Sequence, residues 1–371
     1  MSENTLTFIG PIGEHHSLGK APREGALALE RLGYSAALWE PRGQFAWFDE
    51  HYRQTCEHLV SPTAGALNYA LADWGSPRNR ALNIPKRRIR GLCYDEFAAE
   101  GIRIPLWNQE FEFLVSPSRW GCEWAVDHGL NCRYAPLGVN TLDYYPVERD
   151  DTILRKFHRV TGGGINDDTV VFVHAGTLQQ RKGTAELLAA YSRAFGSDDN
   201  VALLIQSSPA AWRDATTRNV LERRNCPTLW ACDGGLSLAE QRRLYSIATM
   251  TVLPNYCEGF GLVALESLAC GAPVMLPSHT GNLECQDCEA VVWLYGAIEE
   301  PHPKMPSFRW WRPNVDALVG NLRAAKAHSD TLRSMRPQAV LDAAKHPWET
   351  GVQMIADWLG LRQCSTQSPS G

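Results

Sequence analysis

The stretch VLPNYCEGFGLVALESLACG, residues 252–271, predicts a strand, a glycine-containing turn and a helix in immediate succession. The apolar strand ends at Pro254, and a helix begins near Gly261, where apolar residues resume at helical spacing. Backbone N–H groups at the start of a helix attract anions. Gly259 and Gly261 carry no side chain that would keep a ligand away from the backbone. The stretch therefore indicates a binding site for a diphosphate group.

Two carboxylates in this stretch suit the recognition of sugar hydroxyls. Glu258 lies in the turn and can accept hydrogen bonds from a sugar, whereas Glu266 lies further along the helix and can do the same for a ribose. Carboxylates fit this task because each oxygen accepts hydrogen bonds from neighbouring hydroxyls. We expect ligand contacts from five residues of the stretch: Gly259, Phe260, Gly261, Leu262 and Glu266.

A second segment, VFVHAGTLQQRKG at residues 171–183, repeats the pattern of a strand that leads into a glycine-containing turn. Gly176 follows the strand, and the adjacent cations Arg181 and Lys182 stand just before the next helix. Paired cations can neutralise a diphosphate that gains charge as its bond to a sugar breaks, which is a form of electrostatic catalysis. We therefore expect Gly176, Arg181 and Lys182 to face the same ligand as Glu258.

Strands and helices alternate in both halves of the chain, which is typical of a mostly parallel sheet with helices on both faces. The sequence predicts an α/β protein with two doubly wound Rossmann-like domains that face each other across a cleft. Expected strands include 59–60, 89–93, 170–174 and 250–253. The predicted organisation is an N-terminal domain at 1–146, a linker at 147–168, a C-terminal domain at 169–347, a C-terminal helix at 348–362 and a disordered tail at 363–371.

Charge and composition limit the classes of partner and location. The 371 residues carry a formal net charge of −5, so bulk attraction to nucleic acid or anionic membranes is not indicated. No apolar run approaches the roughly 18–20 residues that span a bilayer, and residues 1–10 lack the pattern of a secretory signal. We expect a cytoplasmic protein, with a peripheral membrane location as the alternative.

The chain contains 11 cysteines, of which Cys285 and Cys288 form a C-x2-C pair. A zinc site would need two further ligands at a matching spacing, and the sequence shows none. Cysteines scattered through a long chain without a signal peptide are typical of reduced thiols. We therefore expect ordinary thiols and no metal site.

Together these segments resemble the retaining glycosyltransferases of the GT-B fold, specifically glycosyltransferase family 4, also called group 1. Glu258 and Glu266 match the E-x7-E motif of that family, and Arg181 with Lys182 matches its diphosphate-binding Arg/Lys pair. The similarity is strong over residues 169–284 and weaker before residue 110.

The resemblance implies transfer of a hexose-type sugar from a nucleoside diphosphate donor to a hydroxyl acceptor, with retention and without a metal ion or cofactor. Arg181, Lys182 and Glu258 would be catalytic. The donor would bind the C-terminal domain, and the acceptor, a glycan, a lipid-linked sugar or another hydroxyl compound, would bind the N-terminal domain. The C-terminal helix would cross back to the N-terminal domain. The first turn, with Gly10 and Gly13, would face the donor phosphates.

Contacts to the acceptor are expected from the first half of the chain. His15 and His16 are candidates because they lie in the first loop, and Glu96 is a candidate because it follows an expected strand. A cluster of basic residues also stands out, namely Arg78, Arg80, Lys86, Arg87, Arg88 and Arg90. Such a run is usually a solvated face, but it can also meet an anionic acceptor such as a lipid headgroup, a phosphorylated glycan or DNA.

Three other functions fit part of the pattern. A sugar-nucleotide epimerase of the same architecture would need no acceptor. A glycosyltransferase that modifies DNA would use the basic run. A non-catalytic sugar-binding protein would not need all of Arg181, Lys182, Glu258 and Glu266.

Overall fold

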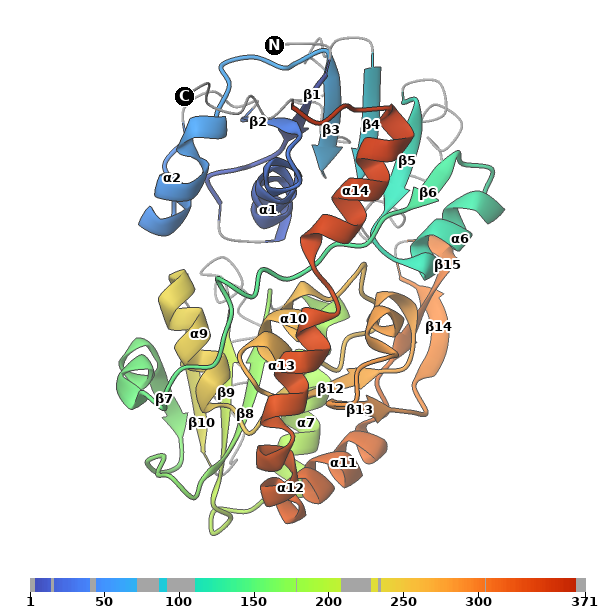
Figure 1. Ribbon diagram of the computed structural model, residues 1–371. Coiled ribbons are helices and arrows are strands. Elements are labelled where there is room, and N and C mark those ends of the chain that lie inside the picture. Colours follow the sequence, from blue (N-terminus) through green and yellow to red (C-terminus); the bar gives the residue numbers. More distant parts are fainter. Residues whose placement is uncertain are drawn as a thin grey trace. The chain divides into compact units, whose positions relative to one another are not determined.

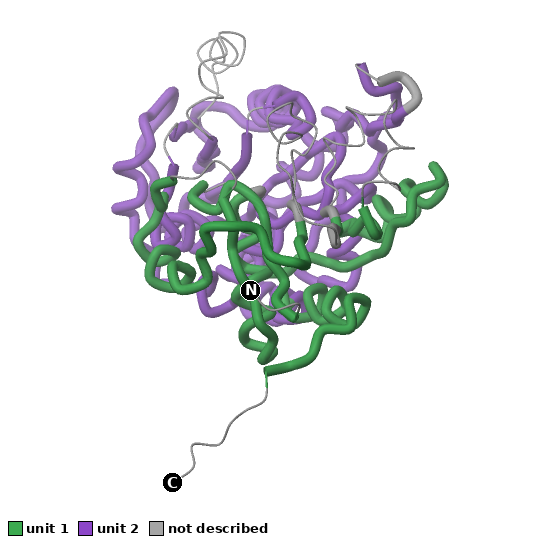
Figure 2. Tube along the Cα trace, turned by 90° about the horizontal axis from the view of Figure 1, so that it is seen from above, with its two compact units in different colours: residues 1–140, 347–371 green, residues 141–346 purple. Residues whose placement is uncertain are grey.

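The computed structural model describes residues 4–14, 17–40, 45–71, 87–91, 111–177, 179–207, 228–232, 235–303 and 305–364. The chain forms two compact units, which Figure 2 distinguishes by colour. The first unit contains residues 1–140 and 347–371, and the second contains residues 141–346.

The first unit is built on a parallel sheet of six strands in the order β2-β1-β3-β4-β5-β6 (Figure 1). All five residues of the first strand are buried, as expected for a parallel sheet that is covered on both faces. The strands are β1 (Thr5–Ile9), β2 (Ser35–Trp39), β3 (Leu67–Leu71), β4 (Arg87–Gly91), β5 (Phe113–Ser116) and β6 (Cys132–Tyr134).

The helices of this unit include one from the far end of the chain. They are α1 (Ser17–Arg31), α2 (Glu50–Cys56), the 3-10 helix η1 (Glu57–Leu59), α6 (Arg119–Asp127) and α14 (Trp348–Leu359). Helix α14 packs against α1, and the Arg31 guanidinium pairs with the Glu349 carboxylate at 2.6 Å. The expected return of the C-terminal helix to the N-terminal domain is thus confirmed.

Close packing of α14 gives a first prediction. A Cβ at Gly351 would lie 1.9 Å from the carbonyl oxygen of Pro136, whereas a Cβ at Gly320 of α11 (Val315–Ala327) would meet nothing within 4 Å. We expect Gly351→Ala to lower the free energy of unfolding by about 1–3 kcal/mol through overpacking. Gly320→Ala, also within a helix, should be neutral or stabilise by up to about 1 kcal/mol. Equal unfolding midpoints in urea for the two variants would contradict this packing.

Two expected strands of the first unit differ from the structure. The strand expected at residues 59–60 is wrong, because Leu59 ends η1 and Val60 forms only an isolated bridge with Leu38. The strand β3 follows instead, a few residues later. The strand expected at 89–93 is present as β4 and begins earlier, at Arg87, whereas residues 92 and 93 lie outside the described part of the chain.

The second unit contains a seven-stranded sheet in the order β13-β12-β11-β8-β9-β10-β7. Every pair is parallel except β10 with β7, at the edge of the sheet. The strands are β7 (His158–Thr161), β8 (Val170–Ala175), β9 (Val201–Gln206), β10 (Leu229–Cys232), β11 (Met250–Val252), β12 (Val274–Pro277) and β13 (Val291–Leu294). A separate hairpin pairs β14 (Ile298–His302) with β15 (Met305–Arg312).

Helices cover this sheet in packed groups, with α7 against α11 and α10 against α13. The aromatic rings of Phe172, Tyr191 and Phe195 lie together in the core between β8 and α7. The helices are α7 (Thr184–Ala194), α9 (Leu238–Ile247), α10 (Leu262–Ala269), α11, α12 (Ser329–Ser334) and α13 (Arg336–Ala344), and the 3-10 helices are η2 (Asp151–Lys156), η3 (Gln180–Lys182) and η5 (Thr280–Cys285). The predicted α/β fold with two Rossmann-like units is confirmed.

The linker expected at residues 147–168 is instead part of the second unit. Asp150 caps η2 by accepting a hydrogen bond from the Thr152 amide at 2.9 Å, and β7 then pairs with β10. A polar, glycine-containing segment can thus add an edge strand, because only one side of such a strand needs a partner. The boundary between the units follows Asn140 rather than residue 146.

The first two residues of the tail that was expected to be disordered, Gln363 and Cys364, form hydrogen bonds in the structure. The Gln363 side chain donates to the carbonyl oxygen of Leu32 at 3.0 Å, and the Cys364 amide donates to that of Gly33 at 2.7 Å. Residues 365–371 lie outside the described part of the chain. Over the residues that the structure describes, no helix has the length and apolar character needed to cross a membrane.

Candidate active site

Three neighbouring strands of the second unit end in the loops that build the candidate site. In the order β12-β11-β8, the carboxyl ends of parallel strands lie at one edge of the sheet, where α/β proteins bind ligands. The loop after β8 carries Arg181 and Lys182, the loop after β11 carries Glu258, and the loop after β12 carries Thr280. Strand order therefore brings together segments that are far apart in the sequence.

The two cations are fixed by the short helix η3 and by the glycine that follows it. Gly183 adopts a left-handed conformation with φ of 68° and begins α7. The Tyr256 amide donates to the carbonyl oxygen of Arg181 at 2.7 Å, which joins this loop to the loop that follows β11. The Lys182 side chain runs beside Gly176, because a Cβ added at Gly176 would lie 3.7 Å from Lys182 Cε. The local backbone thus directs both cations toward Glu258.

Glu258 is the acidic partner of both cations. Lys182 Nζ donates to Glu258 Oε2, and Arg181 Nη1 lies 3.5 Å from Oε1. The three side chains are between 15% and 17% exposed, so the cluster is largely shielded but reachable from solvent. The structure therefore brings together the three residues for which the sequence predicts a catalytic role.

The loop after β12 holds Glu258 through its backbone. Thr280 Oγ1 accepts a hydrogen bond from the Glu258 amide at 3.1 Å, and the Gly281 amide donates to the Glu258 carbonyl oxygen at 2.9 Å. A Cβ at Gly281 would lie 2.5 Å from the carbonyl carbon of Gly259, so only glycine fits there. Sequence reasoning missed these two residues. A signal was present, because Thr280 and Gly281 follow another apolar strand.

His174 ties the same strands together from inside the sheet. Its Nδ1 lies 2.8 Å from the Val252 carbonyl oxygen, and its Nε2 lies 2.9 Å from Thr184 Oγ1 at the start of α7. Burial lowers the pKa of His174 to about 4, opposed by the Val252 carbonyl and assisted by Lys182. A neutral imidazole therefore connects β8, β11 and α7 beneath the cluster.

The charge state of Glu258 is set by its neighbours. Burial by itself would raise its pKa, but Lys182 and Arg181 outweigh burial and lower the pKa from 4.5 to about 2. The folded protein thus favours the ionised carboxylate. Its contribution to stability is complete above pH 4.5 and is lost as the pH falls toward 2.

This shift predicts a pH-dependent difference between the native protein and Glu258→Gln. Above pH 4.5 the ionised carboxylate should contribute on the order of 3 kcal/mol, and this contribution should shrink progressively at lower pH. Urea unfolding of both proteins between about pH 5 and 3 measures the difference, because carboxylates elsewhere in the chain cancel in the subtraction. A difference that stays constant with pH would show that the cations do not lower the pKa of Glu258.

Helix α10, which follows Glu258, begins at the N-terminus for which the sequence predicts an anion-binding role. Gly261 is its N-cap, with φ of 99°, and none of the described side chains caps this end. The Gly259 amide donates to Glu258 Oε1 at 3.2 Å. Phe260 and Leu262 are buried, at 4% and 8% exposure, so only their backbones are suited to contact a ligand.

Glu266 lies deeper than its predicted role suggests. It is 4% exposed and raises the pKa of the neighbouring Tyr245 hydroxyl, after the larger effect of burial. The structure therefore places Glu266 against α9, with little surface left for a ribose.

The first turn of the first unit is closely packed against other parts of the protein. A Cβ at Gly13 would lie 2.6 Å from the Ala46 carbonyl oxygen, so the space beside this glycine is filled by the protein itself. Arg23, fully buried on α1, donates to the carbonyl oxygen of Glu14 at 2.7 Å and stacks on Tyr52. The sequence did not single out Arg23. Contact of Gly10 and Gly13 with phosphates stays a prediction.

The candidate acceptor residues His15, His16 and Glu96 lie outside the described residues, as do three members of the basic run, Arg78, Arg80 and Lys86. The other three members, Arg87, Arg88 and Arg90, belong to β4, which lies between β3 and β5. Part of the run thus forms an internal strand of the sheet.

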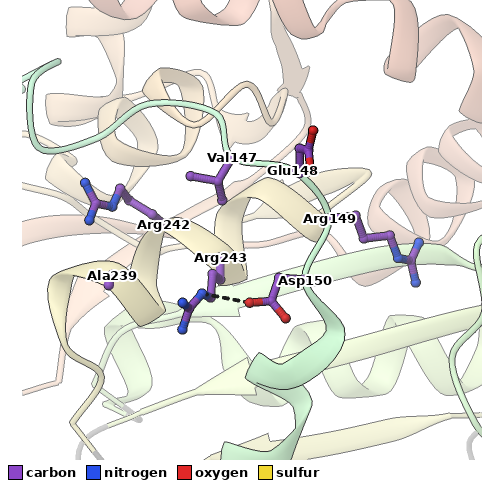
Figure 3. A pocket seen from close by; sticks show the side chains of 7 residues that line it. All are labelled: Val147, Glu148, Arg149, Asp150, Ala239, Arg242 and Arg243. Carbon is purple, nitrogen blue, oxygen red and sulfur yellow. Dashed lines mark ion pairs between the residues drawn. The ribbon is translucent and has the colours of Figure 1, made fainter.

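A shallow depression of about 370 Å³ lies elsewhere on the second unit, beside the start of α9 (Figure 3). Its charged residues are partly paired, with Arg243 Nε 2.9 Å from Asp150 Oδ2. It is lined by Val147, Glu148, Arg149, Asp150, Ala239, Arg242 and Arg243. None of the predicted catalytic residues lines it, so we assign it no part in the chemistry.

Comparison with protein families matches residues 160–287 to the family described as glycosyl transferases group 1. The matched region contains Arg181, Lys182 and Glu258 together with the strands that position them. Residues 160–287 thus match a group 1 glycosyltransferase domain. The recognition of this family from the two glycine-containing turns is confirmed.

Curated relatives of this glycosyltransferase domain include the D-inositol 3-phosphate glycosyltransferase of Thermobifida fusca, which is 28% identical over 66% of this chain and 53% of the relative. The O-antigen chain mannosyltransferase B of Escherichia coli is 31% identical over 48% of this chain and 42% of its own length. The chain spans about half the length of the D-inositol 3-phosphate glycosyltransferases that it matches.

Solved structures extend the similarity over both units. The Anabaena protein HepE in complex with UDP-glucose matches with a TM-score of 0.65 at 14% identity, over 96% of this chain and 99% of that protein. At this identity the match establishes the fold alone, and that fold is GT-B.

Proposed function

We propose that the protein transfers a sugar from a nucleoside diphosphate donor to a hydroxyl group of an acceptor, in the synthesis of a glycan or glycoconjugate. One observation carries this proposal: Lys182 and Arg181 meet the Glu258 carboxylate beside the uncapped start of α10. A sugar diphosphate needs cations for its phosphates and an acceptor of hydrogen bonds for its hydroxyls, and this cluster offers both.

The charges of the cluster fit binding of the donor diphosphate and its departure from the sugar. Two cations and one carboxylate leave a net positive charge, which suits a diphosphate. When the sugar–phosphate bond breaks, negative charge grows on the leaving diphosphate, and Lys182 with Arg181 would stabilise it. Glu258 would then accept a hydrogen bond from a hydroxyl of the donor sugar. Amides at the start of α10 would add further donors to the phosphates.

We further propose retention at the anomeric carbon and a reaction that needs no metal ion or cofactor, as the resemblance to family 4 implies. Glu266 is the proposed contact to the ribose of the donor. The names of the relatives describe transfer to an inositol phosphate and to an O-antigen chain. These names support a hydroxyl acceptor on a phosphorylated or polymeric carbohydrate. A cytoplasmic or membrane-peripheral location stays part of the proposal.

A DNA acceptor gains no support. Half of the basic run lies in an internal strand of the sheet, and the names of these relatives do not mention nucleic acid. An epimerase of the same architecture is separated from a transferase by the need for an acceptor.

The proposal is tested first by binding. A panel of nucleoside diphosphate sugars is screened for a rise in Tm, because a ligand at 100 times its Kd adds about 2.7 kcal/mol to stability. The donor found is then incubated with and without hydroxyl acceptors. We expect release of nucleoside diphosphate and a glycoside of unchanged anomeric configuration, read by NMR. An epimerised donor without acceptor would identify the epimerase instead, and no binding to any donor would refute both.

A further inference from the structure

Two buried thiols and an imidazole come together at the far end of η5 from Thr280. Cys285 ends this helix and Cys288 lies three residues later, with exposures of 1% and 5%. The Cys288 amide donates to the Cys285 carbonyl oxygen at 3.0 Å, so the two residues close a tight turn. A turn of this kind places side chains i and i+3 on the same side, as a C-x2-C pair requires to form a disulfide.

The imidazole belongs to His346, the last residue of the second unit in sequence. His346 follows α13, and its Nε2 lies 3.4 Å from Cys288 Sγ. With its proton on Nε2, the ring donates to the sulfur and stabilises a thiolate. Helix α13 is tied to the same turn, because Lys345 Nζ donates to the Asp287 carbonyl oxygen at 3.1 Å. The Asp342 carboxylate also accepts from the Ala290 amide at 2.7 Å.

The two thiols differ in acidity, as a nucleophilic and a resolving cysteine do. The neighbouring Cys285 thiol and then His346 lower the pKa of Cys288 to about 6, although burial and Asp342 oppose them. The pKa of Cys285 is raised well above its ordinary value, first by Cys288 and then by burial. Cys288, which also contacts His346, is thus the more acidic thiol of the pair.

A metal site does not explain this arrangement. Within the described ranges, no group of three or more His, Cys, Asp and Glu residues is placed to hold a metal ion. The turn itself is superficial, because Gln286, Asp287 and Glu289 are exposed around the two buried cysteines. A small oxidant therefore has only the side chains of one surface turn to pass.

We propose that Cys285 and Cys288 form a redox-active pair that a hydroperoxide converts to an intramolecular disulfide, with Cys288 as the attacking thiolate and His346 as its positioning residue. Cys288 Sγ attacks one peroxide oxygen, the O–O bond breaks, and the leaving oxygen departs as water or an alcohol after protonation. Cys288 is then a sulfenic acid. The Cys285 thiol loses its proton and attacks Cys288 Sγ, the S–O bond breaks and water leaves. The two thiols supply the two electrons that reduce the peroxide.

The sequence allows a direct test on the native chain. Cleavage after Glu284 and Glu289 releases residues 285–289, a peptide with these two cysteines alone. Reduced protein is treated with hydrogen peroxide, and the remaining thiols are blocked with a maleimide under denaturing conditions. The protein is then cleaved by a glutamate-specific protease, and the mass of peptide 285–289 is measured by mass spectrometry. We expect this peptide to carry no maleimide and to be two hydrogen atoms lighter than the reduced, unlabelled peptide. Dithiothreitol added before the maleimide should reduce the disulfide, so that both cysteines are labelled. The buried Cys270, whose pKa burial raises, is the internal control and should keep its maleimide.

Variants assign the roles. In Cys285→Ser, dimedone should label Cys288 as a sulfenic acid, whereas in Cys288→Ser, Cys285 should stay reduced. His346→Gln should slow oxidation at pH 7 roughly threefold or more, because less Cys288 is ionised. A native peptide that carries two maleimides after peroxide treatment would overturn the proposal, as would stoichiometric zinc in the purified protein. Sugar transfer enters none of these measurements, so they stand apart from the test of the proposed function.

Discussion

Replacing Lys182 by methionine should lower kcat for sugar transfer by about 10²–10³-fold, the usual loss when one group that stabilises transition-state charge is removed. Lys182 Nζ contacts Glu258 Oε2 in a cluster that is about 15% exposed, so water cannot fully replace the charge. Methionine keeps most of the length and apolar surface of the side chain, which limits changes in packing. Release of nucleoside diphosphate, followed with saturating donor and acceptor, gives kcat directly.

The same change should also destabilise the protein, and a second variant separates the two effects. Without Lys182, the one cation that Glu258 keeps among the described residues is the more distant Arg181, and a poorly compensated buried carboxylate costs about 1–3 kcal/mol. In Lys182→Met/Glu258→Gln the buried carboxylate is gone and Arg181 keeps its hydrogen bond to Gln179, so part of the stability should recover while transfer stays lost. A double variant that regains activity along with stability would assign Lys182 a purely structural role.

A surface pair in the same unit provides the matched control. Lys326 pairs with Asp199, with side chains 35% and 31% exposed. Such pairs contribute about 0–1 kcal/mol, so Lys326→Met should change stability little and leave kcat unchanged. If Lys182→Met behaves like this control, with full kcat in a folded protein, the proposed stabilisation of the diphosphate is wrong.

Substituting Gly183 by alanine should produce the largest loss of stability among the single changes considered. Gly183 has φ of 68°, and a Cβ there would lie 1.9 Å from the Pro254 carbonyl oxygen. The left-handed conformation costs a non-glycine residue roughly 1–2 kcal/mol, and a clash with backbone adds roughly 1–3 kcal/mol. We expect Gly183→Ala to lower the free energy of unfolding by roughly 2–5 kcal/mol, measured by urea denaturation.

The clash should also displace Lys182 in the candidate site, because Gly183 directly follows Lys182 and begins α7. A displacement of about 1 Å in a catalytic group can cost 10²-fold in rate, so kcat/KM should fall even where the variant is folded. Gly296→Ala is the matched control in the same unit. Gly296 has φ of 78°, but a Cβ would meet only Asn314 at 3.7 Å. It should show the conformational cost alone, and equal losses in the two variants would exclude the clash.

Much of the candidate site was recognisable from local sequence, for a physical reason. A strand that ends in a glycine-containing turn before a helix can be read from neighbouring residues alone, and both predicted turns have this form in the structure. Arg181, Lys182 and Glu258 were chosen for their position in those turns, and the structure brings their side chains together. Their catalytic role remains a prediction.

Other features could not be predicted because their partners are remote in sequence. Thr280 and Gly281 gain their role only when β12 lies next to β11. The pairing of β14 with β15 was not expected either, because alternation of strands and helices gives no sign of a separate hairpin. The prediction of a linker at residues 147–168 was wrong for a related reason. A polar segment becomes an edge strand only if a neighbouring strand offers a free edge, as β10 does for β7.

The sequence by itself therefore determined the α/β class, the two glycine-containing turns and the chemical types of the charged residues, since these depend on local conformation and composition. Only the tertiary structure decided which of these residues meet. Adjacent placement of β8, β11 and β12 joins Lys182 to Glu258, and the end of α13 brings His346 to Cys288. Strand order and helix packing depend on the burial of the whole core, which no single segment specifies.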